Sequence, residues 1–303
     1  MIDNDVLFSL PGLYQYAALN MQLLNLKRNF PLWFRENAKI DNIYGSFPCV
    51  WNGGRSWDGT FSINDVISAV TFLNSNGIKI RYTFTNCFID EKIVYDTIGN
   101  AILTATRDNQ SLRNGIIIAN ETMYNYIKEN YPEFDIIYST TMMIKDVDEI
   151  NKYSEKHLII PDYSINNDFE KLKKLEHPEN IELLCNEECV ENCKKRRVHY
   201  ENNSLIQLKK DVEPLGCENI GGLTYADIKK RRHYISFENI EKNYIPLGIN
   251  KFKIAGRSSF ILKTVESYVD FFAKPEFAEE VRYYLLAFLL NDGDSNQTLV
   301  IRR

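Results

Sequence analysis

Cysteines are the residues of this 303-residue chain whose types and spacing best suit metal chemistry. Cys189 and Cys193 lie close together, and Cys217 follows in the same long segment, residues 186–225. Three thiolates at this spacing could converge on Zn²⁺ or on an iron–sulfur cluster. The basic run 194–197 would favour their deprotonated, ligating form. The spacing does not choose between the two metals, and small buried thiols without a metal are also common.

The segments that would position these cysteines are short hydrophobic runs that alternate with helical periods. The runs are nearly continuous in hydrophobic residues, as parallel strands buried on both faces are. A helix start is indicated where Asp65 follows Ser62 by three residues, the pattern of a capping box. The candidate strands are residues 43–47, 78–85, 115–119, 135–139, 157–161, 181–185, 233–236 and 251–255.

Eight repeats of strand and helix favour a closed sheet over an open one. An open doubly wound sheet usually has a glycine-rich phosphate turn after its first strand, and residues 47–55 lack it. The sequence therefore predicts an α/β fold of the (β/α)8 TIM-type barrel class. We expect one domain over residues 1–303, made of a helical extension (1–40), the barrel (41–275), and an extra helix with a tail (276–303).

Barrel enzymes build their sites at the carboxyl ends of the strands. Cys49 follows the first expected strand, so it could reach the same mouth as the three clustered cysteines. Cys185 ends the sixth expected strand; it is the reserve ligand, and its side chain could instead point into the barrel wall. Several polar residues are expected at these ends too. His199, Asp162 and Glu187 are the candidates for acid–base catalysis. The candidates for substrate binding are Arg55, Asn86, Ser139, Arg197, Lys253 and Arg257.

The basic members of this set have two possible roles. Arg55, Lys253 and Arg257 could hold a carboxylate or phosphate, because the end of the last strand is a common anion site in barrels. They could instead form ion pairs with Glu187 or Asp162 that stabilise the mouth. The sequence leaves both roles open.

Five segments, in their order and spacing, resemble the collagenase-like peptidase family U32. The most specific are Ser-Thr-Thr-Met at 139–142 and Phe-Lys-Ile-Ala-Gly-Arg at 252–257; the others are 43–66, 82–86 and 181–189. The family includes oxygen-independent hydroxylation proteins of ubiquinone synthesis and of RNA modification. The resemblance implies a barrel and, in many members, a 4Fe-4S cluster, with zinc as the alternative. It implies as its four ligands Cys49, Cys189, Cys193 and Cys217.

The chain departs from the family pattern at two places. The family has His-Gly before its cysteine after the sixth strand, where this chain has Asn-Glu-Glu at 186–188. The family's Arg-Glu after the fifth strand is Pro-Asp at 161–162. The fold therefore transfers more readily than the activity, and the chain is expected to be a divergent member.

Three functions follow as hypotheses. The first is an iron–sulfur enzyme that modifies a small molecule or a nucleoside by oxygen-independent hydroxylation or related redox chemistry. The second is a peptidase-like hydrolase. The third is a non-catalytic partner subunit that is stabilised by metal and pairs with a homologous chain.

Composition restricts the partners of the chain. Its formal net charge of −5 argues against a broad nucleic-acid surface. No apolar run is long enough to span a membrane, and an acidic N-terminus is unlike a signal peptide. We therefore expect a cytoplasmic protein that has reduced cysteines and does not bind membranes.

Overall fold

A closed ring of parallel strands forms the centre of the molecule. The computed structural model describes residues 5–53, 59–213, 215–216, 223–256 and 261–291. Its eight-stranded sheet has the order β6-β5-β4-β3-β2-β1-β8-β7, and every neighbouring pair is parallel. The strands are β1 Val6–Pro11, β2 Ala38–Gly45, β3 Lys79–Phe84, β4 Gly115–Ile118, β5 Asp135–Tyr138, β6 Leu158–Ile159, β7 Glu182–Leu184 and β8 Lys251–Lys253.

A bridge between the outer strands turns this sheet into a barrel. Ile159 at the end of β6 pairs in parallel with Ile181, the residue before β7. Because the two strands lie at opposite ends of the sheet order, their pairing closes the ring. The structure therefore confirms the (β/α)8 TIM-type barrel.

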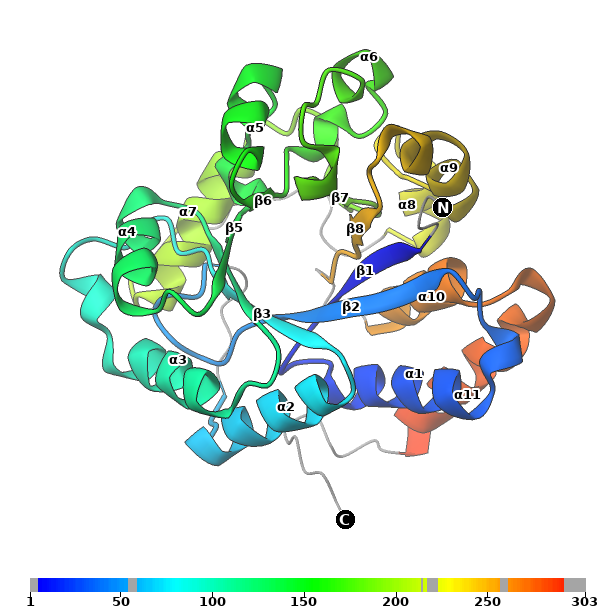
Figure 1. Ribbon diagram of the computed structural model, residues 1–303, viewed down its shortest axis with the longest axis horizontal. Helices are drawn as coiled ribbons and strands as arrows, with labels where there is room; N and C mark the ends of the chain where they lie inside the picture. Colours follow the sequence, from blue (N-terminus) through cyan, green and yellow to red (C-terminus); the bar gives the residue numbers. More distant parts are fainter. Residues whose placement is uncertain (1–4, 54–58, 214, 217–222, 257–260, 292–303) are drawn as a thin grey trace.

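Helices surround the strands (Figure 1). The first six each follow the strand of the same number; α7 to α9 lie between β7 and β8, and α10 and α11 follow β8. They are α1 Ala17–Asn29, α2 Ile63–Ser75, α3 Thr97–Asn109, α4 Glu121–Asn130, α5 Val147–Ser154, α6 Phe169–Leu172, α7 Arg196–Gln207, α8 Tyr225–Lys229, α9 Phe237–Asn239, α10 Ile261–Phe272 and α11 Ala278–Asn291. Short 3₁₀ turns are Pro31–Trp33, Ile93–Tyr95, Thr140–Met142, Tyr163–Ile165, Pro178–Asn180, Ile245–Leu247 and Pro275–Phe277, and Ile240–Tyr244 is a π turn.

Side-chain caps begin several of these helices. The capping box expected at Ser62 is confirmed, since Ser62 Oγ accepts from Asp65 N–H at 3.2 Å and Ser62 N–H donates to Asp65 Oδ2 at 2.6 Å. Asp96 and Asn120 cap α3 and α4 with a side-chain oxygen alone, which accepts from the amides of Gly99 and Met123. These local bonds satisfy orphan amides at the start of each helix, and each helix then packs its apolar face on the sheet.

The first strand was missing from the sequence interpretation. Residues 1–40 are not a helical extension, because β1 lies within them and pairs with β2 and β8. Phe8 of β1 is fully buried and packs against Phe271 and Phe272 of α10 in tilted and edge-to-face arrangements, with ring centroids 5.3 and 5.1 Å apart. A hydrophobic run of six residues has the same periodicity signal as part of a buried helix, which explains the error.

The expected strand at 233–236 is wrong as well. Ile235 N–H donates to Cys185 O at 2.9 Å, but the segment forms no ladder and Ser236 then caps α9. The side chain of His233 bonds to the backbone oxygen of Glu187 at 2.9 Å. The chain thus has the expected number of strands, with β1 in place of this segment.

The two sides of the sheet differ in character. Outward-facing side chains such as Phe8 are apolar, whereas the inside holds a charged network. Arg81 Nη1 lies 2.8 Å from Glu182 Oε1, and Arg81 Nη2 lies 3.0 Å from Asp41 Oδ2. Ser9 Oγ accepts from Asn42 Nδ2 at 2.6 Å and donates to Glu182. The network ties β1, β2, β3 and β7 together inside the ring.

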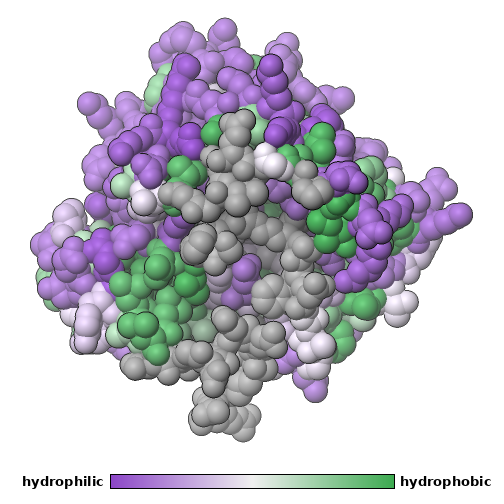
Figure 2. All heavy atoms as spheres, turned by 180° about the vertical axis from the view of Figure 1, so that it is seen from behind, coloured by the Kyte–Doolittle hydropathy of each residue, from purple (hydrophilic) through white to green (hydrophobic). Residues whose placement is uncertain are grey.

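The outer surface is mostly polar. Figure 2 shows hydrophilic residues over much of the face opposite to that of Figure 1, with hydrophobic residues in several separate groups, the largest at the lower left. Among the described helices, none is long and apolar enough to cross a membrane.

The position of β1 leads to a test by truncation. Deleting residues 1–12 should abolish the cooperative thermal transition seen by circular dichroism, because the ring would lose a central strand. Phe8→Ala should lower the free energy of unfolding by about 3–5 kcal/mol. Leu32→Ser, at a side chain that is 73% exposed, is the control and should change it by less than about 0.5 kcal/mol. A truncated chain that melts like the full chain would restore the helical-extension interpretation.

Candidate functional site

A cavity of ≈ 190 Å³ opens at the carboxyl ends of the strands. Almost every strand contributes to its wall, together with the β1–α1 loop and α7. It is lined by Pro11, Gly12, Leu13, Tyr14, Gln15, Tyr44, Gly45, Ser46, Asn52, Gly53, Thr83, Thr85, Ile117, Ser139, Thr140, Thr141, Ile160, Leu184, His199, Tyr200, Asn203, Lys253, Ala255 and Gly256. This is the end of the barrel at which enzymes of this fold carry their active sites.

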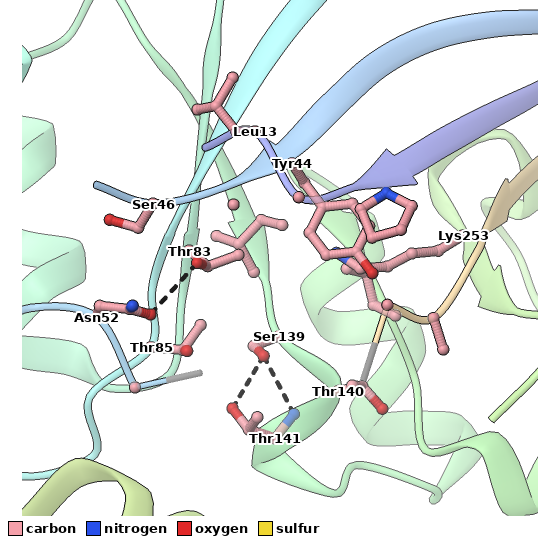
Figure 3. A pocket seen from close by; sticks show the side chains of 18 of the residues that line it. Leu13, Tyr44, Ser46, Asn52, Thr83, Thr85, Ser139, Thr140, Thr141 and Lys253 are labelled. Atoms are coloured by element: carbon pink, nitrogen blue, oxygen red, sulfur yellow. Dashed lines mark hydrogen bonds between the residues drawn. The ribbon is translucent and has the colours of Figure 1, made fainter. Parts of the chain in front are cut away.

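Lys253 contributes a buried amine to this cavity. It is the last residue of β8, and its side chain is only 6% exposed. Its Nζ lies 3.4 Å from the centroid of the Tyr44 ring, and Tyr44 Oη donates to Ile254 O at 2.6 Å, which holds the ring in place. Figure 3 shows Lys253 and Tyr44 on one side of the pocket and Asn52 and Thr85 on the other.

The surroundings of Lys253 weaken its hold on a proton. Burial lowers the pKa of Lys253 to about 7; the charge of Glu182 opposes this, and that of Arg81 adds to it. Glu182 is ion-paired with Arg81, and no carboxylate of the described residues forms an ion pair with Lys253. Near neutral pH the amine therefore exists in both its protonated and its neutral forms.

Hydroxyl groups supply much of the polar wall. Ser139 Oγ accepts hydrogen bonds from Thr141 N–H at 3.1 Å and from Thr141 Oγ1 at 2.9 Å (Figure 3). Thr83 Oγ1 donates to Asn52 Oδ1 at 3.5 Å. Thr85 comes two residues after Thr83, and both line the cavity. Such groups both donate and accept, which suits a ligand that has several hydroxyl or carbonyl oxygens.

A buried ion pair places α7 over the cavity. Arg196 Nη1 lies 2.7 Å from Asp162 Oδ2, and Asp162 Oδ1 accepts from Ser164 N–H at 2.8 Å. Arg196 Nε also donates to Tyr200 Oη at 3.0 Å. The helix thereby presents His199, which is half-buried, and Tyr200 to the cavity. Asp162 thus holds the helix in place and does not line the cavity.

The other expected catalytic and binding residues lie away from the cavity lining. Asn86 is buried and donates to Val50 O at 2.7 Å and to Ser204 O at 3.2 Å. Glu187 is buried and accepts from Cys189 N–H at 2.9 Å. Arg197 is exposed on α7. Of the expected set, the structure brings Ser139, Lys253 and His199 together, and Arg55 and Arg257 lie outside the described residues.

The expected metal ligands lie in two environments. Cys49 is buried in the apolar layer outside the sheet, where Ser46 Oγ lies 3.8 Å from its Sγ. Burial raises the pKa of the Cys49 thiol to about 11, which opposes the thiolate form that a metal needs. Cys189 and Cys193 are partly exposed in the segment between β7 and α7. Cys217 lies outside the described residues.

Among the described residues, no three side chains of His, Cys, Asp or Glu form a group that could hold a metal ion. Cys49, Cys189 and Cys193 are all described, so these three thiols do not form such a group. The expected four-cysteine site, which also includes Cys217, stays a prediction. Cys185 ends its strand with its Sγ 3.2 Å from Lys253 O, inside the wall of the barrel.

Sequence reasoning missed several residues of the cavity, among them Tyr44, Asn52 and the pair Thr83 and Thr85. Thr83 lies in β3, and Thr85 follows its last residue. Because residues two apart in a strand face the same side, this spacing could have predicted that both threonines line the cavity. Tyr44 and Asn52 carry no such signal, because only the closed ring shows that they face Lys253.

No family model and no curated protein matches this chain. Among solved structures, that of the U32 peptidase Mk0906 is similar, with a TM-score of 0.51 and 11% sequence identity over 84% of this chain and 94% of that chain. A phospho-2-dehydro-3-deoxyheptonate aldolase from Thermotoga maritima also matches, with 12% identity over 84% of this chain and 70% of that chain, but its TM-score of 0.23 carries no argument. The chain therefore has a U32-peptidase-like fold, and at 11% identity the likeness shows the fold alone.

The burial of Lys253 leads to a test by pH. The unfolded chain keeps the Lys253 proton up to a pH of about 10, whereas the folded chain loses it near 7, so burial of this residue costs most at low pH. Lys253→Met should raise the free energy of unfolding by about 2–4 kcal/mol at pH 6, and the gain should fall steadily between pH 7 and 10. Urea denaturation across this range measures it.

The exposed Lys152 supplies the control for this test. Lys152→Met should change the free energy of unfolding little, and equally at every pH. A gain for Lys253→Met that stays constant from pH 6 to 10 would mean that the folded chain does not release the Lys253 proton in this range.

Proposed function

We propose that this chain is an enzyme that converts a small organic molecule in the cavity at the mouth of the barrel, with Lys253 as the reacting group. The observation that carries the proposal is a nine-tenths-buried amine in a cavity of ≈ 190 Å³. A protein that buries an amine without an ion pair gives up stability, and such groups are common at functional sites.

The chemistry available to Lys253 depends on its neutral form. A neutral amine can accept a proton from a substrate or attack an electrophilic carbon, and a pKa close to the working pH makes both forms available. His199 and Tyr200 on α7 and Ser139 after β5 line the same cavity. They supply hydrogen-bonding groups that can orient a ligand near the amine.

This proposal predicts that activity is lost when the Lys253 amine is removed and kept when an exposed lysine is removed. Incubating the protein with a mixture of small metabolites and following the mixture by mass spectrometry should show that specific compounds are consumed. Lys253→Met should slow their consumption by about 10³-fold or more, because the reacting group is removed. Lys152→Met should convert them at the wild-type rate. Equal rates for the wild type and Lys253→Met would overturn the proposal.

An iron–sulfur redox enzyme is the second candidate. It is favoured by Cys189 and Cys193, which are partly exposed and lie four positions apart in the segment that leads into α7. These two residues suit a cluster with Cys217, and the basic residues at 194–197 would stabilise their thiolates. A 4Fe-4S cluster there would supply electron transfer, and zinc would supply structure alone. Oxygen-independent hydroxylation stays a hypothesis within this second candidate, and a non-catalytic partner subunit stabilised by metal stays a separate hypothesis.

Metal analysis of protein prepared without oxygen tests this candidate. We expect a coloured protein whose iron is lost in Cys189→Ser, Cys193→Ser and Cys217→Ser. Cys49→Ser should keep its iron, because that thiol is buried apart from the pair, and the exposed Cys87→Ser is the matched control. A colourless protein without iron or sulfide would remove the candidate, and loss of iron from Cys49→Ser would show that Cys49 is a ligand.

A peptidase activity is suggested by the name of the U32 structure. It would need a nucleophile and a base in the cavity. Ser139 and His199 both line the cavity, but no hydrogen bond joins them, and Ser139 Oγ bonds to Thr141 instead. The geometry of the described residues therefore favours chemistry at Lys253 over a serine-type hydrolase.

A further inference from the structure

We propose that Lys253 forms a covalent imine with a hydroxylated aldehyde or ketone, of the kind found in short open-chain sugars. The inference rests on the proposed function and deepens it, because it names the bond that is formed and the class of substrate. It is carried by three features of the cavity: the partners of Lys253, the charge arrangement beneath it and the groups that face it.

The first feature is the lack of a competing partner for the amine. Lys253 Nζ touches the Tyr44 ring, and within the described part of the chain it has no hydrogen bond or ion pair. A lysine that served only to balance a buried charge would be expected beside a carboxylate. Here Lys253 lines the cavity, and the contact given for its Nζ is the uncharged Tyr44 ring.

The second feature is that the buried carboxylates are already neutralised. Glu182 Oε1 accepts from Arg81 Nη1 at 2.8 Å and also from Ser9 Oγ. Asp41 bonds to Arg81 at 3.0 Å and lies 3.5 Å from Lys79 Nζ. Because Arg81 serves both carboxylates, the network holds together without Lys253. These ion pairs therefore explain why Arg81 is buried. They do not explain why Lys253, a second buried cation, lies close by.

The third feature indicates the substrate class. Lys253 shares the cavity with side chains that are neutral and rich in hydroxyl groups: Tyr44, Ser46, Asn52, Thr83, Thr85, Ser139, Thr140 and Thr141. Hydroxyl and amide groups match the alternating donors and acceptors of a hydroxylated chain. Ser139 Oγ, for example, accepts two hydrogen bonds from Thr141 and keeps its own O–H to donate. An oxygen of a hydroxylated ligand can accept from it, and a purely apolar carbonyl compound gains fewer such bonds.

The chemical step is balanced within the cavity. The lone pair of neutral Lys253 Nζ attacks the carbonyl carbon, the carbon–oxygen π bond breaks, and the oxygen takes the proton that the nitrogen releases, which gives a carbinolamine. The hydroxyl group then takes a second proton from solvent and leaves as water, while the nitrogen lone pair forms the carbon–nitrogen double bond of a protonated imine, an iminium ion. The positive charge then lies over the Tyr44 ring, a face that attracts cations. No oxidant or reductant is consumed.

Reductive trapping tests the inference with the wild-type full chain. The probes are dihydroxyacetone and glyceraldehyde, each with sodium cyanoborohydride, which donates a hydride to the iminium carbon and makes the bond permanent. Mass spectrometry of peptides should show that Lys253 gains the mass of the probe less one oxygen atom. Labelling of Lys253 should be about a hundredfold faster than that of the exposed Lys152 at pH 7, because far more of its amine is neutral.

Matched probes and variants define the controls. Acetone and propanal, which lack the hydroxyl groups, should label Lys253 about tenfold more slowly than dihydroxyacetone and glyceraldehyde. Lys253→Met should take up no label beyond its exposed lysines, and circular dichroism should show that it is folded. Lys253→Arg keeps the positive charge but should not form the adduct, since the guanidinium is never neutral in proteins.

The outcomes of these experiments test the imine, its substrate class and the proposed function separately. If Lys253 is not labelled faster than Lys152, the imine is overturned. If Lys253→Met nevertheless abolishes turnover, the proposed function stands and Lys253 acts through its proton alone. Equal labelling by hydroxylated and plain carbonyl probes would overturn the substrate class. If dihydroxyacetone labels Lys253 in the wild type and the adduct forms in no variant that lacks the amine, the inference is supported.

Discussion

Closure of the parallel sheet is the constraint on which the rest of this structure depends. In a closed ring of parallel strands all carboxyl ends meet at one mouth, so side chains from distant segments line a single cavity. The ring requires β1, which lies between β2 and β8, and a short contact between Ile159 and Ile181. Tyr44 on β2 and Lys253 on β8 are brought into contact by that arrangement, although more than half of the chain separates them.

The inside of the ring holds a network of ion pairs and, next to it, the Lys253 amine, whose burial lowers the stability of the fold. Arg81 holds Glu182 and Asp41 with hydrogen-bonded ion pairs, which offset the cost of burying three charges. Lys253 lies above them with an aromatic ring as its contact and a pKa near 7. A protein that retained this amine for structure would stabilise it with a carboxylate. Its neutral form is better explained by chemistry in the cavity.

The likeness to the U32 peptidase concerns the fold and not the activity. At 11% identity the two chains share the barrel, and nothing in that likeness transfers a substrate or a cofactor. The function must therefore be inferred from the residues of this chain alone. Those in the cavity point to amine chemistry on a small hydroxylated molecule. Cys189 and Cys193, which are partly exposed in the segment between β7 and α7, are the residues on which the proposed metal centre depends.

The sequence by itself determined the fold class, most of the strands and the mouth as the place of the site, because hydrophobic periodicity and caps such as Ser62 are local signals. It also found Lys253, Ser139 and His199. Only the tertiary structure decided that Val6–Pro11 is a strand and that Asp162 pairs with Arg196. The same holds for the burial of Cys49. The physical reason is that pairing partners and burial depend on contacts between segments far apart in the chain, which no local pattern records.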